Sequence, residues 1–270
     1  MSLSEQDFLE PACPFDFSMW TGAPAETVPI RRIMERSDDL LSRDDFDGAE
    51  KHLLYWLKSA EAFRDIRGAF FLHNELIGFY RKCGNEARAL EEIDAALSLT
   101  KDDRIGRDNV GAATLYVNAG TALLRFEQSE KAMPFFLEAQ KIYERDLPEG
   151  SEKRGGLYNN MALTLADLER WEEAEQYFLK AIREMEQVEN GELEQAVSYL
   201  NLCDVLLPSD PRIPDYLDLA EKCLDTETLP RDSYYAYTVD KCAPVFESYG
   251  RSAYAKTLLS RKAAILGEKE

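Results

Sequence analysis

A pattern of two successive helices recurs about every forty residues along this chain. The clearest copy reads LYNNMAL at 157–163, WEEA at 171–174 and YFLKAI at 177–182. One period earlier, LYVNAG at 115–120 and FFLEA at 135–139 repeat the same order of aromatic, small and apolar positions. Self-similarity at a fixed period is typical of supersecondary units that stack to share one continuous core. It also favours binding over catalysis as the function.

One position in the second helix of each unit fixes the register of the repeat, and we call it the anchor. The sequence assigns the anchors, at spacings of 40, 43, 42, 42 and 39, to Ala49, Ala89, Ala132, Ala174, Tyr216 and Ala255. A bulky residue follows four positions later in most units, at Leu53, Ile93, Phe136, Phe178 and Leu259, with Ala220 as the exception. Positions four and seven apart lie on one helix face, so this pattern predicts helix packing. The sequence therefore predicts an all-α fold of about six helix pairs.

At these residues the chain resembles the tetratricopeptide repeat family, from about 29 to 266 and most strongly around Ala132 and Ala174. The usual period of that family is 34 residues. A period near 42 is similar to the longer-repeat branch that includes kinesin light chain and several bacterial peptide-sensing regulators. The resemblance implies a right-handed α-solenoid whose first helices line the concave face. Because Tyr216 replaces a small anchor and Pro208, Pro211 and Pro214 precede or flank it, we expect the fifth unit to be irregular there.

The sequence divides into three segments, which we take as residues 1–26, 27–266 and 267–270. The first is an irregular tail in which prolines alternate with aromatic residues, including Phe8, Phe15, Phe17 and Trp20. Such a tail favours extended structure over a helix. We expect it to dock on the solenoid, either as a cap on the first helix pair or in the groove. The last segment is a polar terminus.

Charge limits the kinds of partner that the chain can take. It has 32 basic and 51 acidic residues, which gives a net charge of −19. Such a field repels phosphate backbones and anionic lipids, so we expect neither nucleic acid nor a membrane as partner. The charge belongs either to solvated helix faces or to a surface that attracts a basic segment. Apolar stretches are far shorter than the ~20 residues of a membrane span, and the acidic N-terminus differs from a secretory signal, so we expect a cytoplasmic, bacterial-type protein.

Metal, cofactor and enzyme patterns are not supported by the sequence. Five cysteines include no Cys-x-x-Cys pair, and the two histidines, His52 and His73, lie in no zinc-binding spacing. The acidic run at 44–48 suggests a calcium loop, but its first and twelfth ligands would be Arg43 and Leu54, so helix capping explains it better. Nucleophile-elbow, phosphate-loop and dinucleotide patterns do not occur. We expect a non-enzymatic protein without metal or cofactor.

A column of asparagines is the strongest candidate binding feature. Asn118, Asn160 and Asn201 recur on the first helices at spacings of 42 and 41. An asparagine amide has two donors and an acceptor, so such a column can hold the backbone of an extended peptide. This arrangement resembles the asparagine ladder of peptide-binding repeat proteins of this type. Alternatively, each asparagine caps or bridges neighbouring helices. Glu75 and Lys241 occupy the flanking positions, with opposite charges.

Further groove residues follow from a similar helical phase. They are Asn74, Lys82, Thr121, Arg125, Asn159 and Asp167. Lys82 and Arg125 would be basic positions within an acidic molecule, suited to a carboxylate or an acidic side chain. For each of these residues the alternative is an ordinary solvated helix face.

These observations predict a scaffold that holds a protein or peptide segment, of basic character, in the concave groove. One alternative is a peptide-responsive regulator of the quorum-sensing type, which here lacks an N-terminal output module. Another is an architectural subunit that oligomerises through its outer surface or its ends. The sequence leaves the oligomeric state open.

Overall fold

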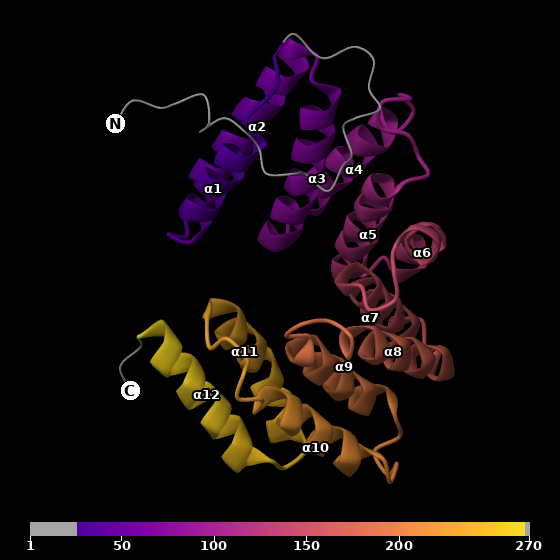
Figure 1. Cartoon of the computed structure of the whole chain (residues 1–270), viewed down its shortest axis with the longest axis vertical. Coiled ribbons are helices and arrows are strands. Elements are labelled where there is room, and N and C mark those ends of the chain that lie inside the picture. Colours follow the sequence, from indigo (N-terminus) through magenta and orange to yellow (C-terminus); the bar gives the residue numbers. More distant parts are fainter. Residues whose placement is uncertain (1–25, 268–270) are drawn as a thin grey trace. The chain divides into compact units, whose positions relative to one another are not determined.

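The computed structural model describes residues 26–267, and within that range the chain forms twelve helices and no strand (Figure 1). The helices are α1 (Ile30–Leu41), α2 (Phe46–Phe63), α3 (Ile66–Cys83), α4 (Glu86–Leu99), α5 (Val110–Arg125), α6 (Ser129–Asp146), α7 (Glu152–Asp167), α8 (Trp171–Met185), α9 (Glu192–Val205), α10 (Ile213–Leu224), α11 (Ser233–Ser248) and α12 (Ser252–Leu266). The predicted all-α solenoid of six helix pairs is confirmed. The predicted tail, apart from Glu26, and residues 268–270 lie outside the described residues.

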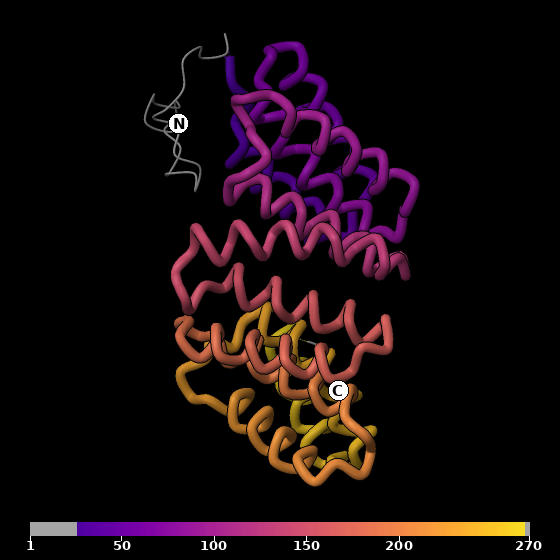
Figure 2. Tube along the Cα trace, turned by 90° about the vertical axis from the view of Figure 1, so that its right-hand side faces the viewer, coloured from indigo at the N-terminus to yellow at the C-terminus, as the bar shows by residue number. Residues whose placement is uncertain are grey.

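The chain divides into two compact units, residues 1–139 and 140–270, with the boundary inside α6. The first unit contains α1 to α5, and the second contains α7 to α12. Within each unit successive helices run in alternating directions and lie side by side, as the trace shows (Figure 2). No helix between residues 26 and 267 has the length and apolar character needed to cross a membrane.

Most turns inside a helix pair are short and contain one residue in the left-handed region. That residue is Asp44, Gly84, Glu127, Glu169 or Gly250, with φ between 57° and 78°. A left-handed residue ends a helix in a compact turn because it redirects the chain at once. The fifth pair differs, since residues 206–212 connect α9 to α10 over a longer path with no residue in this region. The irregular fifth unit predicted from its prolines is confirmed.

Acidic and amide side chains begin several helices as N-caps. The Asp45 carboxylate accepts a hydrogen bond from the Gly48 backbone N–H at 2.9 Å, which satisfies one of the free donors of the first turn of α2. The Asp65 carboxylate accepts from the Gly68 N–H and also from the Val28 N–H, both at 2.9 Å. Asp65 thereby attaches the chain before α1 to the start of α3. Capping, as predicted, accounts for Asp45 in the acidic run.

The anchor positions are buried, as the sequence predicts, in five of the six units. Full burial of the anchor is found at Ala49, Ala89, Ala132 and Ala174, and Ala255 is nearly fully buried. A small residue at this point lets the two helices of a pair approach closely.

The anchor of the fifth unit is Ile213, and the prediction of Tyr216 is wrong. In α10 the buried residues are Ile213, Leu217, Ala220 and Leu224, with the 4, 3, 4 spacing of Ala174, Phe178, Ala181 and Met185 in α8. Tyr216 is half-buried and stacks on Tyr199 with ring centroids 6.0 Å apart. The same intra-pair contact joins Tyr158 to Tyr177 and Tyr116 to Phe135. Tyr216 is therefore the third residue after an anchor.

In the sixth unit the bulky residue four positions after the anchor is not buried. Leu258 is fully buried, whereas Leu259 is 44% exposed. Among the described residues, no helix follows α12 to cover the side on which Leu259 lies.

Candidate binding site on the first-helix face

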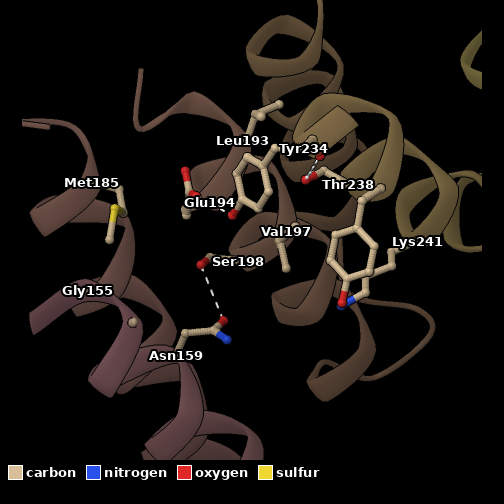
Figure 3. A pocket seen from close by; sticks show the side chains of 12 residues that line it. Gly155, Asn159, Met185, Leu193, Glu194, Val197, Ser198, Tyr234, Thr238 and Lys241 are labelled. Carbon is tan, nitrogen blue, oxygen red and sulfur yellow. Dashed lines mark hydrogen bonds between the residues drawn. The ribbon is translucent and has the colours of Figure 1, made fainter. Parts of the chain in front are cut away.

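A hollow of about 190 Å³ lies on the first helices of the second unit. Residues of α7, α9 and α11 line it, together with Met185 at the end of α8 (Figure 3). Equivalent positions on these three helices are 41 and then 40 residues apart, so Gly156, Val197 and Tyr237 form one row across the hollow. Lys241 occupies the position equivalent to Asn201, one turn further along. We call this site the first-helix hollow.

An amide cluster forms one wall of the hollow. The Oδ1 atom of Asn159 accepts hydrogen bonds from the Ser198 hydroxyl at 3.4 Å and from the Asn201 Nδ2 at 3.3 Å. These two bonds fix the orientation of the Asn159 amide. Its Nδ2 donates to no other residue of 26–267, so two donor hydrogens remain for a ligand.

Two tyrosines from α11 form the opposite side. Tyr234 is 52% exposed and Tyr237 is 57% exposed, although both have large apolar rings. The Tyr234 hydroxyl donates to Oε1 of Glu194 at 2.6 Å. Partial burial and this hydrogen bond raise the pKa of Tyr234 above its ordinary value, so the phenol stays protonated at neutral pH. The Tyr234 ring is thereby held in a fixed position.

Lys241 provides the positive charge of the hollow. Its Nζ lies 4.1 Å from the centre of the Tyr237 ring, which is a cation–π contact. Within the part of the chain that the structure describes, Lys241 has no carboxylate as an ion-pair partner. The ammonium group is therefore available to an acceptor on a bound segment.

Two adjacent glycines of α7 leave space at the edge of the hollow. A Cβ added at Gly156 would meet no atom within 4 Å, so this position is open. A Cβ at Gly155 would lie 2.3 Å from Cε of Met185, so a larger residue there would require the Met185 side chain to shift. Gly156 thus exposes helix backbone without a side chain above it.

Comparison with known proteins identifies the repeats. The tetratricopeptide repeat family model matches residues 113–146 and 156–184. These two stretches are tetratricopeptide repeats. The two matched repeats contain the anchors Ala132 and Ala174, around which the sequence pattern is clearest.

Two solved structures with a similar fold illustrate the likeness. One is BtubC (BKLC) from P. vanneervenii, at 19% identity and a TM-score of 0.57, covering 83% of this chain and 91% of that one. Another is a putative kinesin light chain from Podosopora anserina with nearly identical tetratricopeptide-like repeats, at 14% identity and a TM-score of 0.53, covering 73% and 94%. None of the curated proteins compared with this chain matches it. These similarities concern the fold, and they agree with the longer tetratricopeptide repeat inferred from the sequence.

Of the groove residues predicted from the repeats, Asn159 and Lys241 line the first-helix hollow, and Asn201 donates to Asn159 beside it. Asn160 lies half-buried on α7, and Asp167 is the exposed last residue of that helix. The second unit therefore brings together part of the predicted set.

The remaining predicted residues belong to the first unit. The Asn118 Nδ2 donates to Oδ1 of Asn74 at 3.0 Å, which joins α5 to α3. The Thr121 hydroxyl donates to the Val117 carbonyl at 2.7 Å, one turn earlier in its own helix. Arg125 is the exposed last residue of α5.

Lys82 lies in a second hollow of about 400 Å³, between the start of α2 and the end of α3, where its Nζ is 5.9 Å from the Phe46 ring centre. The structure does not bring Lys82 to the Asn74–Asn118 pair. Glu75 is half-buried in α3, where burial, with a further contribution from the charge of Asp38, raises the pKa of its carboxyl.

Sequence reasoning missed Tyr234, Tyr237 and Glu194. The sequence candidates are polar residues that recur at equivalent positions of the first helices. Tyr234, Tyr237 and Glu194 stand at positions where the residue type changes from one repeat to the next. Their spacing from Lys241 could have identified the two tyrosines, because Tyr237 and Tyr234 lie four and seven residues before Lys241 and thus on the same helix face.

The acidic and metal-type patterns noted in the sequence can be located in the structure. Between residues 26 and 267 no group of three or more histidine, cysteine, aspartate and glutamate side chains is arranged to hold a metal ion. The adjacent Glu172 and Glu173 are exposed at the start of α8, and Glu173 forms an ion pair with Arg170 at 2.7 Å.

Proposed function

We propose that this chain is a non-enzymatic scaffold that binds an extended protein or peptide segment along the first-helix hollow. Tetratricopeptide repeats provide a fold suited to protein interaction, and this coarser role fits the whole chain. The observation that supports the specific proposal is the combination of two exposed tyrosine rings with an amide whose donors are unused.

Each side of the hollow offers a different kind of contact to such a segment. The Tyr234 and Tyr237 rings provide apolar surface at low entropic cost, because their orientations are restrained by Glu194 and Lys241. The Asn159 Nδ2 can donate to a backbone carbonyl, a contact that does not depend on the ligand's side chains. Open space above Gly156 lets a main chain approach α7 closely.

The net charge of −19 favours a segment that carries positive charge outside the hollow. Within it, Lys241 offers one local donor to a carbonyl or carboxylate. We therefore expect a mixed segment, with an apolar side chain against the tyrosines and basic residues at its ends.

The test uses a phage-displayed library of random peptides selected on the full chain, followed by fluorescence anisotropy with the best isolated peptide. Tyr237→Ala should weaken binding about tenfold or more, because the lost ring contact contributes on the order of 1.5 kcal/mol. Asn159→Ala should weaken it by a smaller factor, since one neutral hydrogen bond contributes about 1 kcal/mol.

The matched control is Tyr55→Ala. Tyr55 is 64% exposed on α2, outside the hollow, so its truncation should leave the affinity within about twofold. Equal loss in the Tyr55 and Tyr237 variants would contradict the proposed site, as would a selected peptide that binds both variants with the affinity of the parent chain.

A further inference from the structure

The outer side of α12 has the same packing positions as the other second helices, but they are not covered. The packing positions are the residues four and eleven positions after the anchor of each second helix. In α2 to α10 these positions are all buried, at Leu53 and Ala60, Ile93 and Thr100, Phe136 and Tyr143, Phe178 and Met185, and Leu217 and Leu224. In α12 they are Leu259 and Leu266, which are 44% and 48% exposed.

In α8 these positions are buried because the first helix of the next repeat covers them. α9 packs against α8, and the Gln195 side chain on α9 donates to the Met185 carbonyl at 3.1 Å. No described helix takes this place beside α12. Leu259, Ala263 and Leu266 lie at i, i+4 and i+7, so they form one stripe along the helix, which we call the end seam. This spacing suits contact with another helix.

Charge distinguishes this end of the chain from the rest. α12 contains Lys256, Arg261 and Lys262 and no acidic residue. Residues 233–266 carry five basic and two acidic residues, whereas the whole chain has a net charge of −19. Arg261 and Lys262 pair with Asp225 at 2.6 Å and Asp240 at 2.8 Å. Lys256 is exposed and has no ion-pair partner among residues 26–267.

We propose that the end seam binds an amphipathic helix with acidic flanks, supplied by a partner protein. The apolar stripe of that helix would cover Leu259, Ala263 and Leu266, and its acidic residues would lie near Lys256. A second copy of the chain fits less well, because its own end seam has the same positive surroundings and like charges repel across an interface. The surface is separate from the first-helix hollow.

One helix of the chain itself packs against a second helix and has acidic residues near both of its ends. α9 has Glu192, Glu194 and Asp204 and covers the equivalent face of α8 with its apolar residues. A synthetic peptide with the sequence of residues 192–205 is therefore a suitable probe. A second peptide with Glu192→Lys, Glu194→Lys and Asp204→Lys keeps the apolar residues and reverses the charge.

The experiment titrates each peptide into the isotopically labelled full chain at low salt and follows backbone amide shifts by NMR. The acidic peptide should shift amides of residues 252–266 and bind at least fivefold more tightly than the lysine peptide. Leu259→Asp should weaken binding at least tenfold. The control Leu219→Asp changes an exposed leucine (38%) of α10, which is not part of the end seam, and should stay within twofold of the parent.

Shifts confined to other helices, equal binding of the two peptides, or equal binding to the Leu259→Asp variant would overturn the proposal. Sedimentation velocity of the chain alone supplies another check. A dimer that Leu259→Asp dissociates would show that a second copy occupies the seam, and would also overturn it. Asn159→Ala changes the first-helix hollow only, so unaltered binding of the acidic peptide to that variant separates this result from the peptide-binding function proposed above.

Discussion

Asn201 donates a hydrogen bond from Nδ2 to Oδ1 of Asn159 over 3.3 Å, and this bond joins the first helices of two consecutive repeats. The first unit contains a similar bond of 3.0 Å, from Asn118 to Asn74. In both, the donor is a residue of the predicted column and the acceptor lies in the preceding repeat. Bridging of neighbouring helices was the alternative explanation of the column, and these two bonds support it. These bonds do not prevent contact with a ligand, because the Asn159 Nδ2 has no acceptor among residues 26–267.

The combined variant Asn118→Ala, Asn160→Ala and Asn201→Ala tests both roles. If the column contacts a peptide, each lost amide contact costs on the order of 1 kcal/mol, so affinity should fall by roughly a hundredfold. The two bridging bonds are partly exposed and should lower the thermal midpoint by only a few degrees. Calorimetry and anisotropy on one preparation measure both quantities. A variant that is unfolded at room temperature would show that the column is structural.

The register of the fifth repeat could not be predicted from the sequence because its anchor is not small and the spacing from the preceding anchor is shorter than in the other repeats. The pattern predicts a small anchor about 42 residues after Ala174, and Tyr216 stands at that place. Ile213 is only 39 residues after Ala174, because α8 and α9 are shorter than α6 and α7, and because Ile213 is the first residue of α10 whereas Ala174 is the fourth residue of α8. The aromatic pair Tyr199–Tyr216 reveals the true register, but only contact between two helices makes it visible.

The two registers predict opposite effects of Tyr216→Ala. If Tyr216 were the anchor, alanine would restore the small residue found in the other repeats and would stabilise the chain. Because Tyr216 stacks on Tyr199, we expect the variant to lose about 1–2 kcal/mol of unfolding free energy. The equivalent substitution in the preceding repeat, Tyr177→Ala, is the reference and should have a similar effect. Urea denaturation measures both, and a raised midpoint for Tyr216→Ala would refute the assignment of Ile213.

Helix number, pairing and five of six anchors follow from the sequence, because the small and bulky positions of a repeat are determined by packing within each pair and against the next pair. The first-helix hollow does not follow in the same way. Tyr234 and Tyr237 replace Glu194 and Val197 of the preceding repeat, so no recurrence marks them. Exposure of an aromatic ring depends on its neighbours in three dimensions. Only the structure shows that these rings stay accessible beside Asn159.

Asp65→Ala should destabilise the chain more than Asp45→Ala. Both residues are N-caps at a glycine N–H, with the same 2.9 Å distance. Asp65 is also buried and accepts a second bond from the Val28 N–H, which its loss would leave without a partner. We expect about 1 kcal/mol for Asp45→Ala and about twice that for Asp65→Ala. Thermal melts of the two variants measure the difference, and equal midpoints would mean that the bond to Val28 contributes nothing.

Association at the first-helix hollow should slow as salt rises. The field of a chain with net charge −19 attracts a basic segment over a range that screening shortens. Stopped-flow measurements with a lysine-flanked peptide and its glutamate-flanked counterpart give the association rates. The lysine form should associate faster at low salt, and the difference should shrink at physiological salt. Rates that do not change with ionic strength would exclude electrostatic steering. The end seam should show the opposite preference, because residues 233–266 are net positive.

Glu75→Gln should stabilise the chain at neutral pH. Burial, with a smaller contribution from Asp38, raises the pKa of Glu75 above its ordinary value, so the folded chain binds its proton more tightly than the unfolded chain does. The unfolding free energy contributed by this group therefore falls as pH rises from the ordinary pKa to the raised one, and the loss persists at pH 7. Removing the charge should raise the thermal midpoint at pH 7 by about 2 °C, which corresponds to somewhat less than 1 kcal/mol for a chain of this size. Below the ordinary carboxyl pKa of 4.5 both forms are neutral, and the difference should vanish.

The exposed Glu61→Gln serves as control for the loss of one negative charge from an acidic chain. Calorimetric scans at both pH values supply the data, and a lower midpoint for Glu75→Gln at pH 7 would show that the charged form of Glu75 is instead stabilised in the fold.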